Sequence, residues 1–305
     1  MAPRAIVRAG ARPYTRPMKT VMTADGLALL TQVWPASQRA PGTARGVVVL
    51  VHGLGEHAAR YDHVARRLNG QGFNVVGYDH RGHGRSPGPR GGIVAADDLC
   101  ADLGRVVDAA RKEFAGPLVL LGHSLGGLIA GRFVAEGLGA QPAPWWRPVD
   151  SLVMSSPALD PGTTAFQKFM LAAVAPLLPR LPVNNGLKVD WISRDPAVVQ
   201  AYAADPLVHD RITGRLGLFV AREGAAVIAL APRWKTPTLL MWAGADRCVS
   251  PAGSAAFAAA APRDVVTPRE WPRLYHEIFN EPEQAEVLQV LADWLDMQLP
   301  DRLAA

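Results

Sequence analysis

Short runs of consecutive apolar residues recur along the chain and predict strands that are buried on both faces. Residues 47–53 read VVVLVHG, residues 72–79 read GFNVVGYD, and residues 118–124 read LVLLGHS. Runs of this kind, bounded by glycine, are typical of parallel strands that helices cover on both sides. Further strands are predicted in the segments 150–157, 236–246 and 264–272.

Segments with helical periodicity alternate with these runs. Residues 97–114 carry an apolar residue every three or four positions, and residues 58–70 and 282–298 are also predicted helices. Asn280 and Glu283 resemble a capping box at the start of the last helix. The alternation of strands and helices predicts an α/β fold with a mostly parallel, doubly wound sheet.

Two segments depart from this alternation. Residues 18–34 alternate around Asp25-Gly26, which predicts an N-terminal β-hairpin. Residues 158–235 contain many prolines and no clear strand, and they are too long for a plain loop. We expect them to form a helical cap over the carboxyl ends of the strands, where open α/β sheets bind ligands.

These patterns divide the chain into three parts. Residues 1–17 are expected to form a flexible tail, because they are rich in arginine and lack the apolar core of a signal peptide. Residues 18–157 and 236–305 form the predicted core, and residues 158–235 form the cap. A chain of 305 residues is long enough for one large domain with such an insertion.

Composition narrows the function classes. The net charge of +5 comes from arginines scattered along the chain, which argues against a nucleic-acid partner and leaves weak attraction to an anionic lipid surface open. Cys100 and Cys248 are far apart, which argues against a disulfide scaffold or a zinc site and fits a reducing, cytoplasmic compartment. No segment approaches the roughly 20 apolar residues of a membrane span. The sequence leaves the oligomeric state open.

Ser124 lies in GHSLGG, between a predicted strand and a predicted helix. In this context G-x-S-x-G predicts a tight turn that exposes the serine hydroxyl, while Gly122 and Gly126 let strand and helix approach closely. The alternative is that Ser124 only caps the helix, but capping requires neither glycine. We therefore expect Ser124 to be a nucleophile.

A serine nucleophile needs a base and an acid, which follow it in the order Ser, acid, His in this fold. Asp246 ends a predicted strand, and His276 follows the next strand thirty residues later. His276 is the expected general base, and Asp246 is expected to fix its tautomer and stabilise the imidazolium. Asp264 is a rival acid, but it precedes its strand and should lie at the opposite edge of the sheet.

Backbone amides are the expected donors to the oxyanion. Leu125 follows the nucleophile at a helix start, and Leu54 lies in the loop after the first buried strand. Several histidines occupy two separate loops without ligand-like spacing or a nearby carboxylate cluster, so we interpret them as loop structure and expect no metal. They are His52, His57, His63, His80 and His83.

Several motifs together resemble the monoacylglycerol lipase/lysophospholipase-like serine hydrolases of the α/β-hydrolase superfamily. They are HGLGEHAARY (52–61), YDHRGHGRSPGPRG (78–91), GHSLGG (122–127), SRDPAVVQAYAADPLVH (193–209), AGADRCVSP (243–251) and LYHEIFNEP (274–282). The resemblance runs from about residue 18 to about residue 298. It implies an α/β-hydrolase fold with a mostly parallel eight-stranded sheet, a helical cap, no cofactor, and hydrolysis of a single-chain acyl ester.

The resemblance also assigns roles to single residues. Ser124, Asp246 and His276 match the catalytic triad, and Leu54 and Leu125 match the oxyanion donors. Glu56, Arg60 and Tyr202 match positions in or near the polar pocket that receives the alcohol. Phe279 stands where better-known members carry a histidine of that pocket, which weakens the case for monoacylglycerol as the physiological substrate.

The cap favours a lipid ester, because it is rich in apolar side chains; ordinary packing against the core is the alternative. These side chains are Phe166, Phe169, Met170, Val174, Leu177 and Leu178. Transient membrane contact through the cap stays open. A lysophospholipase, a broad carboxylesterase, an acyltransferase and a ligand-binding protein without hydrolysis are the alternative functions.

Overall fold

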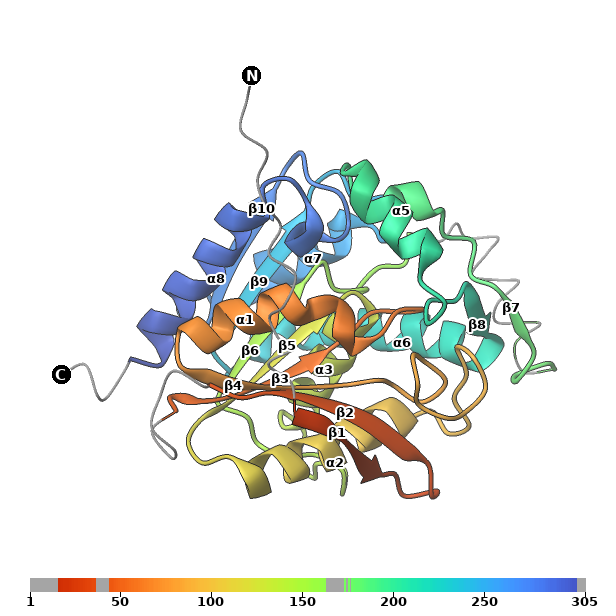
Figure 1. Ribbon diagram of the computed structural model, residues 1–305, viewed down its shortest axis with the longest axis horizontal. Helices are drawn as coiled ribbons and strands as arrows, with labels where there is room; N and C mark the ends of the chain where they lie inside the picture. Colours follow the sequence, from red (N-terminus) through yellow and green to blue (C-terminus); the bar gives the residue numbers. More distant parts are fainter. Residues whose placement is uncertain (1–15, 37–43, 163–172, 174, 176, 301–305) are drawn as a thin grey trace.

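The computed structural model describes residues 16–36, 44–162, 173, 175 and 177–300 (Figure 1). The predicted tail lies outside the described residues as far as position 15, and Arg16 already belongs to the first strand. Of the apolar cap residues named above, only Leu177 and Leu178 are among the described residues; both are exposed.

Eight strands of the described residues form one sheet, as the resemblance predicts. Its order is β1 (Arg16–Met22), β2 (Ala28–Trp34), β4 (Phe73–Tyr78), β3 (Gly46–Val51), β5 (Leu118–His123), β6 (Ser151–Ser155), β9 (Thr238–Ala243) and β10 (Val266–Trp271). Strand β2 runs antiparallel to β1 and β4, and the other neighbouring pairs are parallel. The predicted hairpin and mostly parallel sheet are therefore confirmed.

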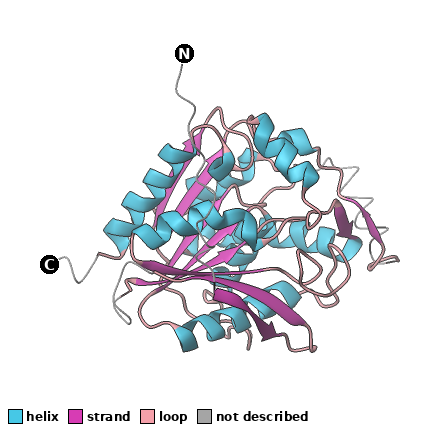
Figure 2. Cartoon of the chain, in the orientation of Figure 1, coloured by secondary structure: helices cyan, strands magenta, loops and turns pink. Residues whose placement is uncertain are grey.

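Helices cover both faces of the sheet (Figure 2). One layer contains α1 (Asp62–Gly70) and α8 (Gln284–Gln298), and the other contains α2 (Asp98–Glu113), α3 (Leu125–Glu136), α6 (Gly214–Leu230) and α7 (Pro251–Ala260). Alternate residues of β3 face opposite layers: Val47 and Val49 pack with α2 and α3, whereas Val48 and Leu50 pack with α1 and α8. Burial on both faces explains why these strands read as continuous apolar runs.

The start of α8 differs from the predicted capping box. Glu283 occupies the N-cap position and makes no side-chain capping bond, and the Asn280 amide instead donates to Glu277. The capping-box prediction is wrong because residues 278–280 form a separate turn of 3₁₀ helix, η4 (Ile278–Asn280), ahead of α8.

The segment predicted as a cap contains two structural parts. Over the strand ends lie η2 (Val189–Trp191), α5 (Pro196–Ala204) and a two-stranded ribbon of β7 (Pro182–Asn184) and β8 (Arg211–Thr213) (Figure 1). The expectation of a segment without strands is wrong, because three-residue strands are too short to give an alternating pattern. Helix α6, within the predicted cap boundary, instead packs against α3 and α7 in the core layer.

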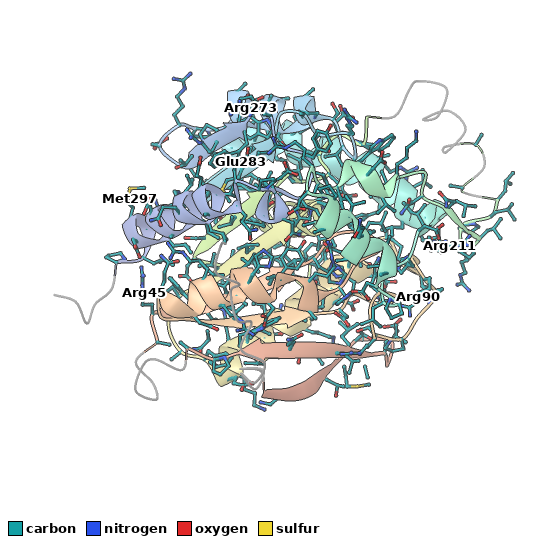
Figure 3. The ribbon with its side chains drawn as sticks, turned by 45° about the horizontal axis from the view of Figure 1, so that its top comes forward. Arg45, Arg90, Arg211, Arg273, Glu283 and Met297 are labelled. Carbon is teal, nitrogen blue, oxygen red and sulfur yellow. The ribbon has the colours of Figure 1, made fainter. Side chains whose placement is uncertain are left out.

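The surface carries arginines on separate elements, as the scattered sequence positions predict. The exposed Arg211 and Arg273 lie at different edges of the molecule (Figure 3). No helix among the described residues combines the length and apolar character needed to cross a membrane.

Candidate active site

Ser124 occupies a strained corner between β5 and α3. Its φ is 55° and its ψ is −119°, a left-handed conformation that few non-glycine residues adopt. The glycines around it permit this corner: a Cβ on Gly122 would lie 2.3 Å from the Gly126 carbonyl oxygen, and a Cβ on Gly126 would lie 2.0 Å from that of Val51. The Ser124 side chain makes no capping bond to α3, so the simple capping interpretation has no support.

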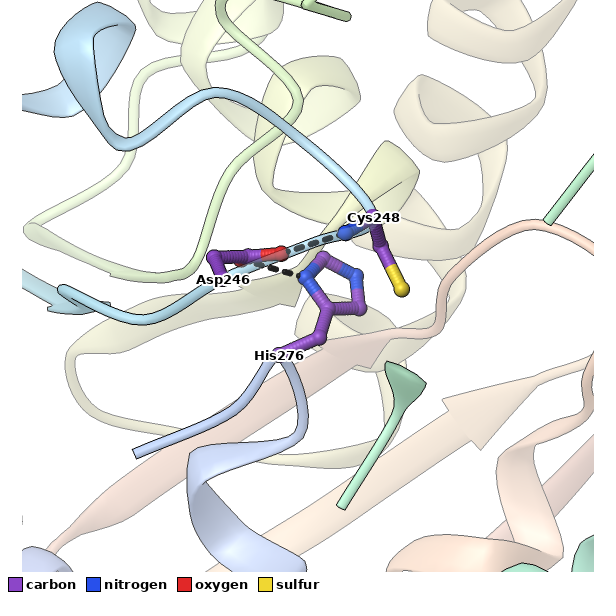
Figure 4. A group of neighbouring side chains, drawn as sticks. All are labelled: Asp246, Cys248 and His276. Atoms are coloured by element: carbon purple, nitrogen blue, oxygen red, sulfur yellow. Dashed lines mark hydrogen bonds and ion pairs between the residues drawn. The ribbon is translucent and has the colours of Figure 1, made fainter. Parts of the chain in front are cut away.

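Asp246 and His276 meet at the carboxyl edge of β9 and β10. The His276 Nδ1–H donates to Asp246 Oδ2 at 2.7 Å, while Asp246 Oδ1 accepts the amides of Cys248 at 2.8 Å and Val249 at 3.1 Å (Figure 4). Burial alone lowers the pKa of His276, but the carboxylates of Asp246, Glu277 and Glu56 together outweigh burial and raise the pKa above its usual 6.5. Nδ1 is thus committed to Asp246, which leaves Nε2 as the ring atom that can accept a proton.

A cavity of about 330 Å³ joins these groups. Ser124, His276 and Leu54 line it together, and Leu125 is the buried first residue of α3, where helix amides have no intrahelical acceptor. The cap contributes apolar lining through Leu187, Val189, Ile192 and Val208. One cavity therefore holds a hydroxyl, an imidazole and the loop of Leu54 beneath a cap surface that is partly apolar and partly polar.

A buried ion network forms the polar wall of this cavity. Glu56 and Tyr202 line the cavity, and Arg60 lies behind them, with its guanidinium 4.6 Å from the Tyr202 ring centre. Arg60 pairs with Glu56 and also donates two hydrogen bonds, both 2.7 Å long, to Glu277. Sequence reasoning missed Glu277, although its position directly after His276 was a usable signal.

Phe279 does not line the cavity. Its ring is 2% exposed and packs in the core cluster with α1 and α8, while its carbonyl oxygen accepts a hydrogen bond from His63 Nε2. The proposed place of Phe279 in the substrate pocket is therefore not supported, because side-chain packing directs the ring into the core.

His52, His80 and His83 form a structural cluster with His209. The rings of His52, His80 and His83 lie within 6 Å of one another, and His83 also contacts His209 of the cap, with 4.6 Å between ring centres. The His80 amide donates to His52 Nε2, so the His52 Nδ1–H donates to the Gly53 carbonyl oxygen. Burial lowers the pKa of His52 and keeps the ring neutral, which fixes the start of the Leu54 loop.

The metal-ligating side chains that gather most closely in the described residues belong to this site. Donor atoms of Asp246, Cys248 and His276 lie within 4.8 Å of one another (Figure 4). The oxygens of Asp246 already accept His276 Nδ1–H and two backbone amides. This bonding explains the cluster without an ion, and we assign it no cofactor.

Comparison with known proteins agrees with the fold. A family model described as "Serine aminopeptidase, S33" (Hydrolase_4) matches residues 42–283. A monoacylglycerol lipase of Mycolicibacterium smegmatis is 36% identical over 289 residues, which cover 92% of this chain and 97% of that protein. The phospholipase YtpA of Bacillus subtilis is 28% identical over 256 residues, which cover 83% of this chain and 96% of that protein.

A solved structure extends this similarity to three dimensions. The crystal structure of the Paleococcus ferrophilus monoacylglycerol lipase has a TM-score of 0.75 at 36% identity and covers 88% of this chain and 99% of that one. The fold is therefore that of the α/β-hydrolases. The chain belongs to the Hydrolase_4 (S33) family and is a monoacylglycerol lipase-like serine hydrolase.

Proposed function

We propose that the protein hydrolyses monoacylglycerols or similar single-chain acyl esters through an acyl-enzyme. The observation that carries this proposal is the shared cavity of Ser124 and His276, in which Asp246 holds the imidazole by a 2.7 Å hydrogen bond. This arrangement matches a nucleophile, a base and an orienting acid. The monoacylglycerol lipase relatives support the ester class.

In this mechanism His276 Nε2 takes the Ser124 proton as Oγ attacks the ester carbonyl. The amides of Leu54 and Leu125 stabilise the oxyanion, and the imidazolium then protonates the leaving alcohol. Water, activated by the same imidazole, releases the fatty acid from Ser124. The raised pKa of His276 favours the imidazolium that forms in each half-reaction.

The cap supports a lipid-like acyl chain and contact with a lipid surface. Leu187 and Val189 line the cavity and are also partly exposed, next to the exposed Leu181 and Val183. Lys188 lies between Leu187 and Val189 and adds positive charge that an anionic surface attracts. We propose transient peripheral contact of this segment with lipid during substrate entry.

A lysophospholipase is the second candidate, and the YtpA relative favours it. An acyltransferase would share the acyl-enzyme and differ only in the acceptor. Rates with monoacylglycerols of short to long chains, a lysophospholipid and a p-nitrophenyl ester series, with fatty acid and transfer products measured separately, distinguish these three functions.

The nucleophile is tested with a fluorophosphonate probe. We expect wild-type protein to be labelled and Ser124→Ala to be unlabelled. Ser156→Ala is the control and should be labelled; it is matched to Ser124 because Ser156 also has a positive φ, of 40°. Equal labelling of wild type and Ser124→Ala would refute the assignment.

A further inference from the structure

We propose that Glu56, Arg60 and Glu277 form a buried carboxylate clamp that positions the catalytic loops and favours the imidazolium form of His276. Glu277 and Arg60 are positioning residues in this proposal, because they act through His276 and through the loop of Leu54. The proposal rests on the proposed function, since it assigns His276 as the base.

The clamp joins two loops that are far apart in the sequence. Glu277 directly follows His276, and each of its carboxylate oxygens accepts a 2.7 Å hydrogen bond from Arg60. Arg60 also pairs with Glu56, whose Oε1 accepts the Gly53 amide at 2.6 Å. Gly53 precedes the predicted oxyanion donor Leu54, so one guanidinium connects the base to the oxyanion loop.

The carboxylates of the clamp are already occupied by protein donors. Glu56 Oε1 accepts the Gly53 amide and the Tyr61 hydroxyl, each at 2.6 Å, while Oε2 accepts Arg60. Glu277 Oε2 accepts the Asn280 amide in addition to Arg60. Groups bonded in this way hold the backbone in place, and this bonding favours a positioning role over direct recognition of the alcohol.

The charge of the clamp is unbalanced and shielded from water. Two carboxylates share one guanidinium, which leaves a net charge of −1, and Glu56 and Glu277 are 2% and 5% exposed. The Tyr202 ring covers the guanidinium from the cap side. A charge buried in this way acts more strongly on its neighbours than it would in water.

His276 is a catalytic group on which this charge acts, and it directly precedes Glu277 in the chain. The titratable groups around its ring are Asp246, Glu277, Glu56, His123 and Cys248. Burial lowers the pKa of His276, and Asp246, Glu277 and Glu56 each raise it. The clamp thereby adds to Asp246 in stabilising the imidazolium that forms as Ser124 attacks.

The test is the pH dependence of kcat/KM for Glu277→Gln, measured with p-nitrophenyl butyrate from about pH 5 to pH 9. Glu281→Gln is a matched control. Glu281 is a buried carboxylate on the same loop, and it pairs with Arg194 and not with Arg60. Active sites are counted with the fluorophosphonate probe, so that misfolded protein does not enter the rates.

We expect the acid limb of Glu277→Gln to move down by about half a pH unit or more, because the imidazolium loses a neighbouring negative charge. The kcat per active site should fall about tenfold, with a smaller change in KM. Glu281→Gln should keep the wild-type midpoint. Glu277→Asp, which keeps the charge, should restore the midpoint but not the full kcat.

An acid limb of Glu277→Gln that coincides with wild type would overturn the proposal, and so would an equal shift in Glu281→Gln. If Glu277→Gln yields no folded protein, Glu56→Gln removes the negative charge of the other carboxylate of the clamp. The midpoint of the acid limb must then fall in Glu56→Gln, or the proposal fails. Failure of the triad itself is recognised separately by equal labelling of wild type and Ser124→Ala.

Discussion

The substitution Asp246→Asn replaces a carboxylate by an amide, and the hydrogen-bond donors around position 246 determine how that amide is oriented. The backbone amides of Cys248 and Val249 both donate to Oδ1, so the carbonyl oxygen of the new side chain must take that position. The NH₂ group then faces His276 Nδ1, in the place of the Oδ2 acceptor at 2.7 Å. His276 must accept there, which moves its proton to Nε2 and removes the lone pair that Ser124 requires.

The expected loss follows from this wrong tautomer. The equivalent change in a serine-protease triad lowers kcat about 10⁴-fold, which corresponds to about 5.5 kcal/mol at ~1.4 kcal/mol per factor of ten. Both backbone hydrogen bonds to position 246 are kept, so the melting temperature should change little. We therefore expect a folded protein with a loss of this size in kcat.

The assay is the initial rate of p-nitrophenyl butyrate hydrolysis near neutral pH, with thermal unfolding followed in parallel. Asp264→Asn is the matched control, since Asp264 is exposed and precedes β10 at the opposite edge of the sheet. A folded Asp246→Asn variant with more than about a tenth of the wild-type kcat would refute the tautomer reasoning. A large loss in Asp264→Asn would move the acid to that residue.

Three further outcomes are expected. Because the pKa of His276 is raised above 6.5 and its neutral form is the active base, kcat/KM should increase with pH through a midpoint above 6.5, and a lower midpoint in the pH profile would contradict this. Gly126→Ala places a Cβ 2.0 Å from the Val51 carbonyl oxygen and should lower the free energy of unfolding, measured by urea titration, by about 3 kcal/mol. Gly70→Ala is the control and should have a small effect, because the space at its Cβ is open. Burial raises the pKa of the Cys248 thiol, so iodoacetamide should modify it at least about tenfold more slowly than glutathione at neutral pH, as measured by mass spectrometry; equal rates would contradict the burial.

The sequence predicts the parts of the fold that follow from local patterns. Continuous apolar runs predict the parallel strands, and the glycines around Ser124 predict the tight turn between β5 and α3. For the clamp, the only local signal is that Glu277 directly follows His276. Its pairing with Arg60 has no local signal, because the two residues are 217 positions apart and come together only when the loops after β3 and β10 meet. The expected place of Phe279 in the substrate pocket is not supported for a related reason. Its position in a motif did not determine the direction of its ring, because packing against α1 and α8 determines that direction.

The cap shows the limit of pattern reasoning most clearly. Strands β7 and β8 are three residues long, and their pairing depends on contacts across the chain. Helix α6 has an apolar composition that fits a cap or a core layer equally well, and only its packing against α3 assigns it to the core. Helical periodicity identifies a buried face, but it does not identify the partner of that face.

We therefore propose that different parts of the chain determine the chemistry and the acyl selectivity of this protein. Ser124, Asp246 and His276 lie on loops that follow core strands, and the buried clamp connects the His276 loop to the oxyanion loop. Most of the apolar lining of the cavity comes from residues 187–208, on short elements outside the sheet. Changes in that segment can alter the acyl group that fits without moving the reacting atoms, because the clamp and the Asp246–His276 pair are anchored in the core. The cap is therefore the part to exchange when substrate preference is tested.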